Sequence, residues 1–172
     1  MTGKLLPIVC DATVVLNLGH RGGLSLIAMK LKAERGLYVT PEVVEEVSQT
    51  DPDFYAAFLA EHFITIGALD GAPPDCTELE DGLLDEGELS VLAVCRDNGW
   101  LAGIDELDGR KAARFLKIPL LGSLGIIDHA VKLLWMSEDE GLDVIRRLRR
   151  GGFHCPKVHA NDDFLDYLAR MR

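Results

Sequence analysis

The 172-residue chain lacks the features of membrane, secreted and disulfide-rich proteins. No apolar run approaches the roughly 18 residues of a bilayer-spanning helix. The first residues show no positive segment followed by an apolar run and a small-residue cleavage site, so we expect no secretory signal. The four cysteines are scattered and never form C-x-x-C, and Cys10 and Cys95 lie in apolar runs typical of reduced core residues. We therefore expect a cytoplasmic protein with no membrane partner.

Positive charge is also scarce, because 18 lysine and arginine residues face 28 aspartate and glutamate residues, a formal net charge of −10. Binding to long polyanions depends on clustered cations, so this balance argues against nonspecific nucleic-acid binding. Two small basic groups are exceptions. They comprise Arg110, Lys111 and Arg114, and Arg146, Arg147, Arg149 and Arg150. The charge therefore leaves room for a small basic rim beside an acidic site.

Several well-known catalytic and phosphate-binding motifs are absent as well. The chain contains no G-x-S-x-G, G-x-G-x-x-G or Walker A loop, and no Ser-His-Asp order. His154, Cys155 and His159 lie close in sequence, but a single thiolate with Pro156 after it argues against structural zinc. The carboxylates are the remaining groups whose pattern suggests chemistry.

The chain does contain an alternation of short apolar strands and helices. We expect strands at 7–11, 37–39, 63–66, 100–104 and 118–121. We expect helices at 13–19, 23–35, 41–47, 52–61, 85–98, 107–117, 123–135, 138–150 and 162–171. Start signals support several of these helices. The signals are Thr40-Pro41, Asp51-Pro52, the capping boxes Asp85–Glu88 and Ser137–Glu140, and Asn161 as the last cap.

This alternation is typical of an α/β sandwich with a small, mainly parallel sheet flanked by helices. The length and the absence of repeats or a linker predict one domain, residues 1–172, with a C-terminal helical extension at about 137–172. The segment 67–84 is acidic, contains Pro73-Pro74 and is unusually long for a loop in a compact domain.

Two of the predicted strands run directly into an aspartate, Asp11 after the first and Asp105 after the fourth. The carboxyl ends of parallel strands share one edge, and ligands bind in the crevice outside it. Glu46 and Glu88 lie in helices that begin near the same edge. The pattern therefore predicts four converging carboxylates from distant parts of the sequence.

Four carboxylates at close range raise one another's pKa, and a hard cation such as Mg²⁺ or Mn²⁺ would relieve the repulsion. Such a cation also supports in-line displacement at a phosphodiester. Each acid has a simpler explanation too. Asp11 and Asp105 are suitable helix caps, and Glu88 closes a capping box. Glu46, with its neighbour Glu45, is compatible with a solvated helix face, and the sequence leaves open which of the two belongs to the cluster.

Five motifs in series resemble the PIN-domain nucleases. They are Asp11–Leu18, Pro41–Val47, Gly87–Ala93, Ile104–Arg110 and Gly122–Ile127. In the same order, the corresponding motifs of the family are D-[TS]-[ST]-P-L-I-N-L, a helix that begins with Pro and carries E-[LV], G-E-x-x-A-x-x-L-A, I-D-[DE]-x-x-G-R and G-[ST]-L-G-[IVL]-[IL]. The order and the spacing of the motifs are similar in this chain. Within the family, the chain resembles an uncharacterised prokaryotic branch that is related to the toxins of toxin–antitoxin pairs, although Val14 replaces the usual proline.

The resemblance implies a PIN-like three-layer sandwich and a Mg²⁺- or Mn²⁺-dependent endoribonuclease that hydrolyses RNA phosphodiester bonds. It implies that the catalytic acids are Asp11, Glu46, Glu88 and Asp105, of which Asp11, Glu88 and Asp105 bind metal. The supporting residues would be Thr13, whose hydroxyl would support Asp11, with Glu106 and Asp108.

The resemblance also implies a toxin of a toxin–antitoxin pair, with an antitoxin partner and a homodimer. Two alternatives remain open. The negative charge favours a catalytically weak PIN-like binding module held by an antitoxin or another partner protein. A strand-terminal Asp11 also suits a phosphotransfer or phosphatase domain, although the second aspartate of one large phosphatase family is missing two residues later.

Overall fold

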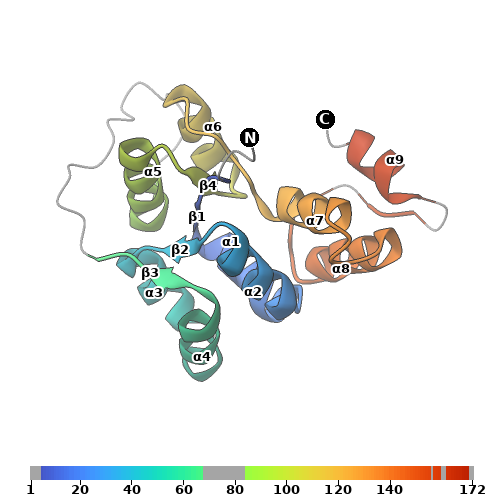
Figure 1. The fold of residues 1–172 in the computed structure, drawn as a ribbon, viewed down its shortest axis with the longest axis horizontal. Helices are drawn as coiled ribbons and strands as arrows, with labels where there is room; N and C mark the ends of the chain where they lie inside the picture. The colour runs from blue at the N-terminus through green and yellow to red at the C-terminus, as the bar shows by residue number, and fades with distance from the viewer. Residues whose placement is uncertain (1–4, 68–83, 156, 160–161, 171–172) are drawn as a thin grey trace.

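Figure 1 shows short strands within a shell of helices. The computed structural model describes residues 5–67, 84–155, 157–159 and 162–170. The strands are β1 (Ile8–Cys10), β2 (Leu37–Val39), β3 (Ile64–Thr65) and β4 (Leu101–Gly103). They form one sheet in the order β3-β2-β1-β4, and each neighbouring pair is parallel. The predicted α/β architecture with a parallel sheet is confirmed.

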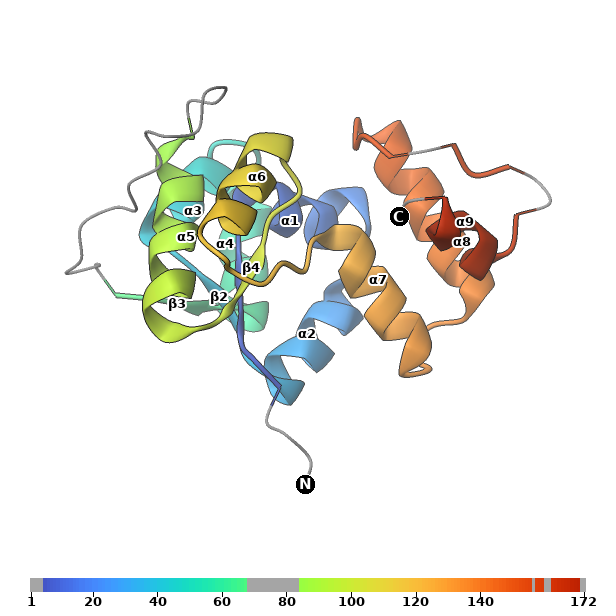
Figure 2. The same ribbon diagram turned by 90° about the horizontal axis from the view of Figure 1, so that it is seen from above.

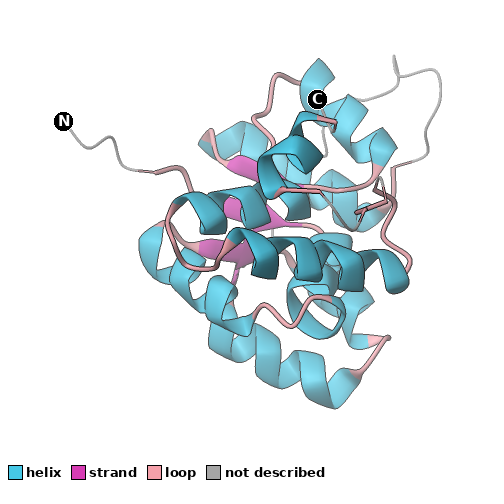
Figure 3. Cartoon of the chain, turned by 90° about the vertical axis from the view of Figure 1, so that its right-hand side faces the viewer, coloured by secondary structure: helices cyan, strands magenta, loops and turns pink. Residues whose placement is uncertain are grey.

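Helices surround the sheet in all three views (Figures 1, 2 and 3). They are α1 (Ala12–Leu16), the wide π-type turn η1 (Asn17–Arg21), α2 (Ser25–Glu34), α3 (Pro41–Ser48), α4 (Pro52–His62), α5 (Glu86–Asn98), α6 (Leu107–Phe115), α7 (Ser123–Lys132), α8 (Glu138–Arg150) and α9 (Phe164–Ala169). Figures 1 and 2 place α3, α4 and α5 on one side of the molecule and α7, α8 and α9 on the other. None of the helices in the described segments has the length and apolarity to cross a membrane.

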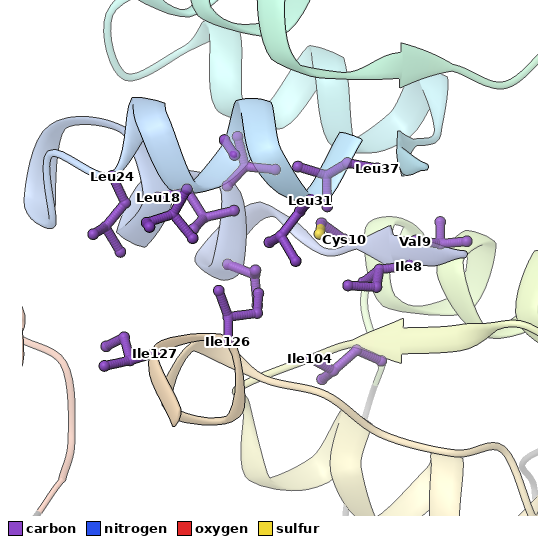
Figure 4. Close-up of a cluster of buried hydrophobic side chains, with 14 of the residues drawn as sticks. Ile8, Val9, Cys10, Leu18, Leu24, Leu31, Leu37, Ile104, Ile126 and Ile127 are labelled. Atoms are coloured by element: carbon purple, nitrogen blue, oxygen red, sulfur yellow. The ribbon is translucent and has the colours of Figure 1, made fainter. Parts of the chain in front are cut away.

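Strand β1 lies at the centre of the sheet because it is apolar on both faces. Ile8, Val9 and Cys10 are fully buried, and β1 pairs with β2 on one side and β4 on the other. A parallel strand covered on both faces reads as a continuous apolar run, which this sequence shows. Figure 4 shows β1 packed with side chains of other elements, including Leu31 and Ile126. The buried hydrophobic residues from β1 to α9 form one cluster.

The helix starts that Pro or capping-box signals mark in the sequence lie where they were predicted. The side-chain oxygens of Thr40 and Asp51 each accept a hydrogen bond from the backbone amide three residues later. A proline follows each of them at the first helical position. Both predicted capping boxes are present, at the starts of α5 and α8. Gly99 ends α5 in the left-handed region, with φ +68°. Short-range hydrogen bonding therefore fixes the ends of these elements.

Three expectations differ from the structure. The strand predicted at 118–121 is a single bridge between Ala102 and Leu120, because Pro119 has no N–H to extend the ladder. The last helix begins later than predicted, with Asp163 as its cap; Asn161 lies outside the described residues. The helix predicted at 13–19 divides into α1 and η1. Most of the predicted loop 67–84 also lies outside the described residues.

The strand order reverses beside β1. The chain moves outward from β1 to β2 and β3, then returns to the other side of β1 to form β4. In open α/β sheets, ligands bind outside the carboxyl ends of the strands at such a switch point. Asp11 follows β1 directly, and Asp105 follows β4 after one intervening residue, Ile104. The fold therefore places these two acids at the position where a ligand is expected.

The central strand should dominate stability. Ile8→Ala removes a fully buried side chain and should lower the free energy of unfolding by about 2–5 kcal/mol. Ile64→Ala deletes the same atoms from edge strand β3, where the side chain is 41% exposed, and should cost about 1 kcal/mol or less. Urea unfolding followed by circular dichroism measures both. Equal losses would contradict a core centred on β1.

Candidate active site

Asp11 combines a capping role with an unsatisfied oxygen. Its Oδ1 accepts a hydrogen bond of 2.9 Å from the Thr13 amide, which caps α1. The residue is only 4% exposed, and Oδ2 is buried with no hydrogen-bond partner. Burial raises the pKa of Asp11, and the nearby charges of Asp105, Glu88 and Glu46 raise it further. Helix capping therefore accounts for one carboxylate oxygen and leaves the other available.

Glu88 repeats this arrangement from the first turn of α5. Its Oε2 accepts from the Asp85 amide at 3.3 Å within the capping box, while Oε1 is buried without a hydrogen-bond partner. The backbone of α6 comes so close that a Cβ added at Gly109 would lie 2.4 Å from Glu88 Oε1. Burial is the main cause that raises the pKa of Glu88. Glu88 Oε1 is thus a second buried carboxylate oxygen that accepts no hydrogen bond of good geometry, although the nearby Gly109 amide lowers the pKa of Glu88.

Asp105 is fixed by donors on both of its oxygens. Oδ1 accepts from the Ser123 amide at 2.8 Å, and Oδ2 accepts from the Ser123 hydroxyl at 2.5 Å and from Asn17 Nδ2 at 3.1 Å. Asn17 is fully buried and Ser123 is 2% exposed. A Cβ at Gly122 would lie 2.5 Å from Asp105 Oδ1, so glycine is required for this approach. Burial raises the pKa of Asp105, although these hydrogen bonds oppose the shift.

The sequence did not identify Asn17 and Ser123 as site residues. Both lie within motifs that carry the family resemblance, and this was the available signal. Their meeting with Asp105 depends on tertiary structure, because Asn17 lies 88 residues before Asp105 and Ser123 lies 18 residues after it. Asn17 begins η1, in which the backbone kinks at Gly19. Wide turns of this kind are frequent at functional sites.

Glu46 lies near the other acids of the edge, and its charge raises the pKa of Asp11. Its Oε2 would lie 3.0 Å from a Cβ at Gly87, which places it against the start of α5. Burial raises the pKa of Glu46, and Asp85 and Glu106 add to the shift. Glu46 is nevertheless exposed, unlike Asp11. It therefore lies at the open side of the acidic edge.

The three predicted supporting residues have different surroundings. The Thr13 hydroxyl donates to Glu106 Oε1 at 3.2 Å, and it is the Thr13 amide that bonds Asp11. Asp108 pairs with Lys111 at 3.0 Å on the exposed face of α6. Thr13 and Glu106 therefore connect the segments that follow β1 and β4, whereas Asp108 has a local surface partner.

The acidic edge has features that fit a divalent cation. Within the described ranges, no three histidine, cysteine or carboxylate side chains lie close enough to enclose a metal ion. However, Asp11 Oδ2 and Glu88 Oε1 are buried acceptors with no donor, and a buried acceptor without a partner is costly. Mg²⁺ usually keeps several waters and needs only one or two carboxylates from the protein. The two unsatisfied oxygens suit a largely hydrated cation of this kind.

Comparison with known proteins gives the family. A family model described as PIN domain (DUF3368) matches residues 7–162. The chain belongs to the PIN-domain family. PIN domains are typically nucleases and generally use divalent metal ions.

Other comparisons are more distant. No curated protein matches the sequence of this PIN domain at a significant level. Among solved structures, it is similar to a PilT N-terminus domain protein from the hyperthermophilic archaeon Sulfolobus solfataricus P2. The two share 14% identity with a TM-score of 0.47, over 88% of this chain and 98% of the other.

Because Asp11 Oδ2 is buried without a hydrogen-bond partner, we expect this PIN domain to become more stable when the charge of Asp11 is removed. Burial raises the pKa of folded Asp11 above its unfolded value of about 3.9. Metal-free protein should therefore lose stability as the pH rises from about 4 through the folded-state pKa. Asp11→Asn keeps a good helix cap without the charge. In EDTA at pH 7 it should be more stable than wild type by at least about 1 kcal/mol, a melting-temperature rise of roughly 2–4 °C.

The difference between Asp11→Asn and wild type should shrink as the pH falls toward about 4, where the wild-type carboxyl is protonated. Asp53→Asn is the control, because Asp53 is exposed on α4 and its difference from wild type should stay nearly constant with pH. Melting curves across this pH range measure both. A wild type more stable than Asp11→Asn at pH 7 in EDTA would contradict the strained carboxylate.

Proposed function

We propose that this PIN domain is a metal-dependent endoribonuclease, with Mg²⁺ or Mn²⁺ at the edge formed by Asp11, Glu88 and Asp105. The observation that carries the proposal is the pair of buried, unpartnered carboxylate oxygens at the switch point of the sheet. Two such oxygens are costly in the protein alone, and a cation offsets that cost. Membership of a nuclease family supports the same chemistry.

The three acids would contribute differently to binding the cation. Asp11 and Glu88 each offer an oxygen that accepts no other hydrogen bond. Oδ2 of Asp105 already accepts two hydrogen bonds, but Oδ1 accepts one and keeps a second lone pair, so Asp105 can serve as a ligand through Oδ1. Ser123 and Asn17 fix the orientation of this carboxylate, as the partners of metal-bound side chains commonly do.

In the proposed reaction, water attacks the phosphorus of an RNA phosphodiester in line with the 3′ oxygen. The phosphorus–O3′ bond breaks, which gives a 5′-phosphate and a 3′-hydroxyl. A bound divalent cation stabilises the charge that develops on the phosphate and makes water more acidic. Glu46 and Glu106 lie at the open side of the edge, where their carboxylates can accept a hydrogen bond from the attacking water.

Cleavage of an RNA panel with and without Mn²⁺ tests the proposal. Asp11→Asn and Asp105→Asn should each lower the cleavage rate at least about 100-fold, because each removes charge from the cation site. Asp53→Asn should cleave like wild type, since Asp53 lies on exposed α4 away from the sheet edge. Cleavage that survives both substitutions, or that continues in EDTA, would overturn the proposal.

Cation binding gives a measurement independent of cleavage. Ser123→Ala removes the hydroxyl bonded to Asp105 Oδ2 and should weaken Mn²⁺ binding by about 10–100-fold, measured as the midpoint of a thermal-shift titration. Ser48→Ala is the matched control, because the Ser48 hydroxyl bonds only Val44 O within α3. Equal Mn²⁺ affinities for Ser123→Ala and Ser48→Ala would show that Ser123 does not position a metal ligand.

The net charge of −10 supports a second candidate, a PIN-like module held by a partner protein. An enzyme that acts on RNA gains affinity and association rate from positive potential, which this chain has only locally. For this candidate, no RNA of the panel is cut and Asp11→Asn leaves partner binding intact. The antitoxin, the toxin role and the homodimer expected from the family resemblance stay predictions.

A further inference from the structure

A cavity of about 720 Å³ opens beside the acidic edge, between α6, α7 and the segment that follows α8. Figure 2 shows α6 on one side of this region and α8 and α9 on the other. Asp105 and Glu106 form the end of the cavity nearest to the proposed cation site. Its volume lies within the range of about 300–1,000 Å³ that is usual for small-molecule sites. The cavity is therefore large enough for one nucleotide.

The walls of the cavity combine apolar side chains with basic ones, and the carboxylates of Asp105, Glu106 and Asp128 also line it. Arg110 and Arg114 line it from α6, and His154 lines it from the segment after α8. Phe153 adds an aromatic ring, and Leu124 and other leucines complete an apolar surface. This combination fits a ligand with an anionic group and a flat apolar face, as a nucleotide has.

The two arginines differ in their existing contacts. Arg110 donates a hydrogen bond of 3.0 Å to Ile104 O, next to Asp105, and is held in place by it. Arg114 is exposed, and no ion pair to its guanidinium occurs among the described residues. Asp128, the acid that α7 adds to the wall, pairs through Oδ2 with Lys132 at 2.6 Å, while its Oδ1 is buried without a hydrogen-bond partner. Arg114 therefore retains its donors for an incoming anion.

This position matters because the neighbouring edge repels phosphate. Asp11, Glu88 and Asp105 concentrate negative charge at the proposed cleavage point, and a cation would neutralise it there. The next phosphate along an RNA strand needs a separate positive group. Arg114 lies in the cavity that opens from Asp105 and can supply it, and His154 can add a hydrogen bond from its ring.

We propose that this cavity is a nucleotide subsite, which takes an unpaired ribonucleotide next to the scissile phosphate of RNA. The apolar walls and Phe153 cover the base, and Arg114 and His154 bind the phosphate. A base can enter the cavity only when it is unstacked and unpaired. The subsite rests on the proposed function for its role in cleavage, but its ligand binding is independent of catalysis.

Titration of the full chain with AMP, CMP, GMP and UMP in EDTA, followed by ¹⁵N–¹H NMR, tests the subsite without turnover. At least one nucleotide should bind saturably and shift the resonances of Phe153 and His154. Phe153→Ala should weaken this binding about 10-fold, the loss usual for a stacked base. Leu124→Trp fills the cavity and should remove the binding.

Two substitutions that each remove one positive charge from α6 distinguish binding in the cavity from nonspecific electrostatic attraction. Arg114→Ala should weaken nucleotide binding about 10-fold or more. Lys111→Ala removes the same charge from the same helix outside the cavity, and it should change the dissociation constant less than about 2-fold. Equal effects of the two substitutions, or no binding of any of the four nucleotides, would overturn the subsite. Inorganic phosphate that binds as tightly as the nucleotides would also overturn it.

The outcomes distinguish the subsite from the proposed function. Nucleotide binding without any RNA cleavage would reject the nuclease and leave the subsite as a nucleotide site. Cleavage that depends on Asp11 without nucleotide binding would reject the subsite and leave the nuclease.

Discussion

Burial of carboxylates at the edge of the sheet is the constraint on which the site depends. β1 must be the apolar centre of the sheet, and the residue after it is Asp11, which is 4% exposed. A charge in that position is unfavourable unless donors or a cation compensate for it. The surrounding structure supplies donors to some oxygens, from the Thr13 and Asp85 amides and from Asn17 and Ser123 around Asp105. Two oxygens receive none, and this incomplete compensation separates a potential binding site from a set of helix caps.

Much of the local structure could be predicted from the sequence, because short-range rules govern it. The capping boxes of α5 and α8 and the Pro-initiated helices α3 and α4 depend on residues three apart, which the sequence displays directly. The sequence also indicated the strand-terminal acids, since two apolar runs end on Asp11 and Asp105. The sequence pattern also predicted a strand at 118–121, which the structure reduces to a single bridge because Pro119 limits the pairing.

The finer geometry of the site could not be predicted, because it depends on contacts between distant segments. The Asn17 amide and the Ser123 hydroxyl are 106 residues apart, and no spacing rule connects them. The same holds for Glu46, whose approach to Gly87 at the start of α5 is a contact between distant segments. The net charge of −10 also proved a poor guide to local potential. Negative charge collects along the acidic edge, while Arg110, Arg114 and His154 line the adjoining cavity.

The position of β4 beside the central strand has a consequence for synthesis on the ribosome. β1 is translated first, but its second neighbour is completed only at Gly103, and Asp105 gains its two hydrogen bonds from Ser123 only when that residue is present. Until then a nascent chain carries β1 as an open, apolar edge, a state prone to pairing with other chains. The order of the strands thus delays completion of the acidic site until more than two-thirds of the 172 residues have been made. A partly translated chain that ends before Ser123 therefore lacks the hydrogen bonds that fix Asp105, and its acidic site is incomplete.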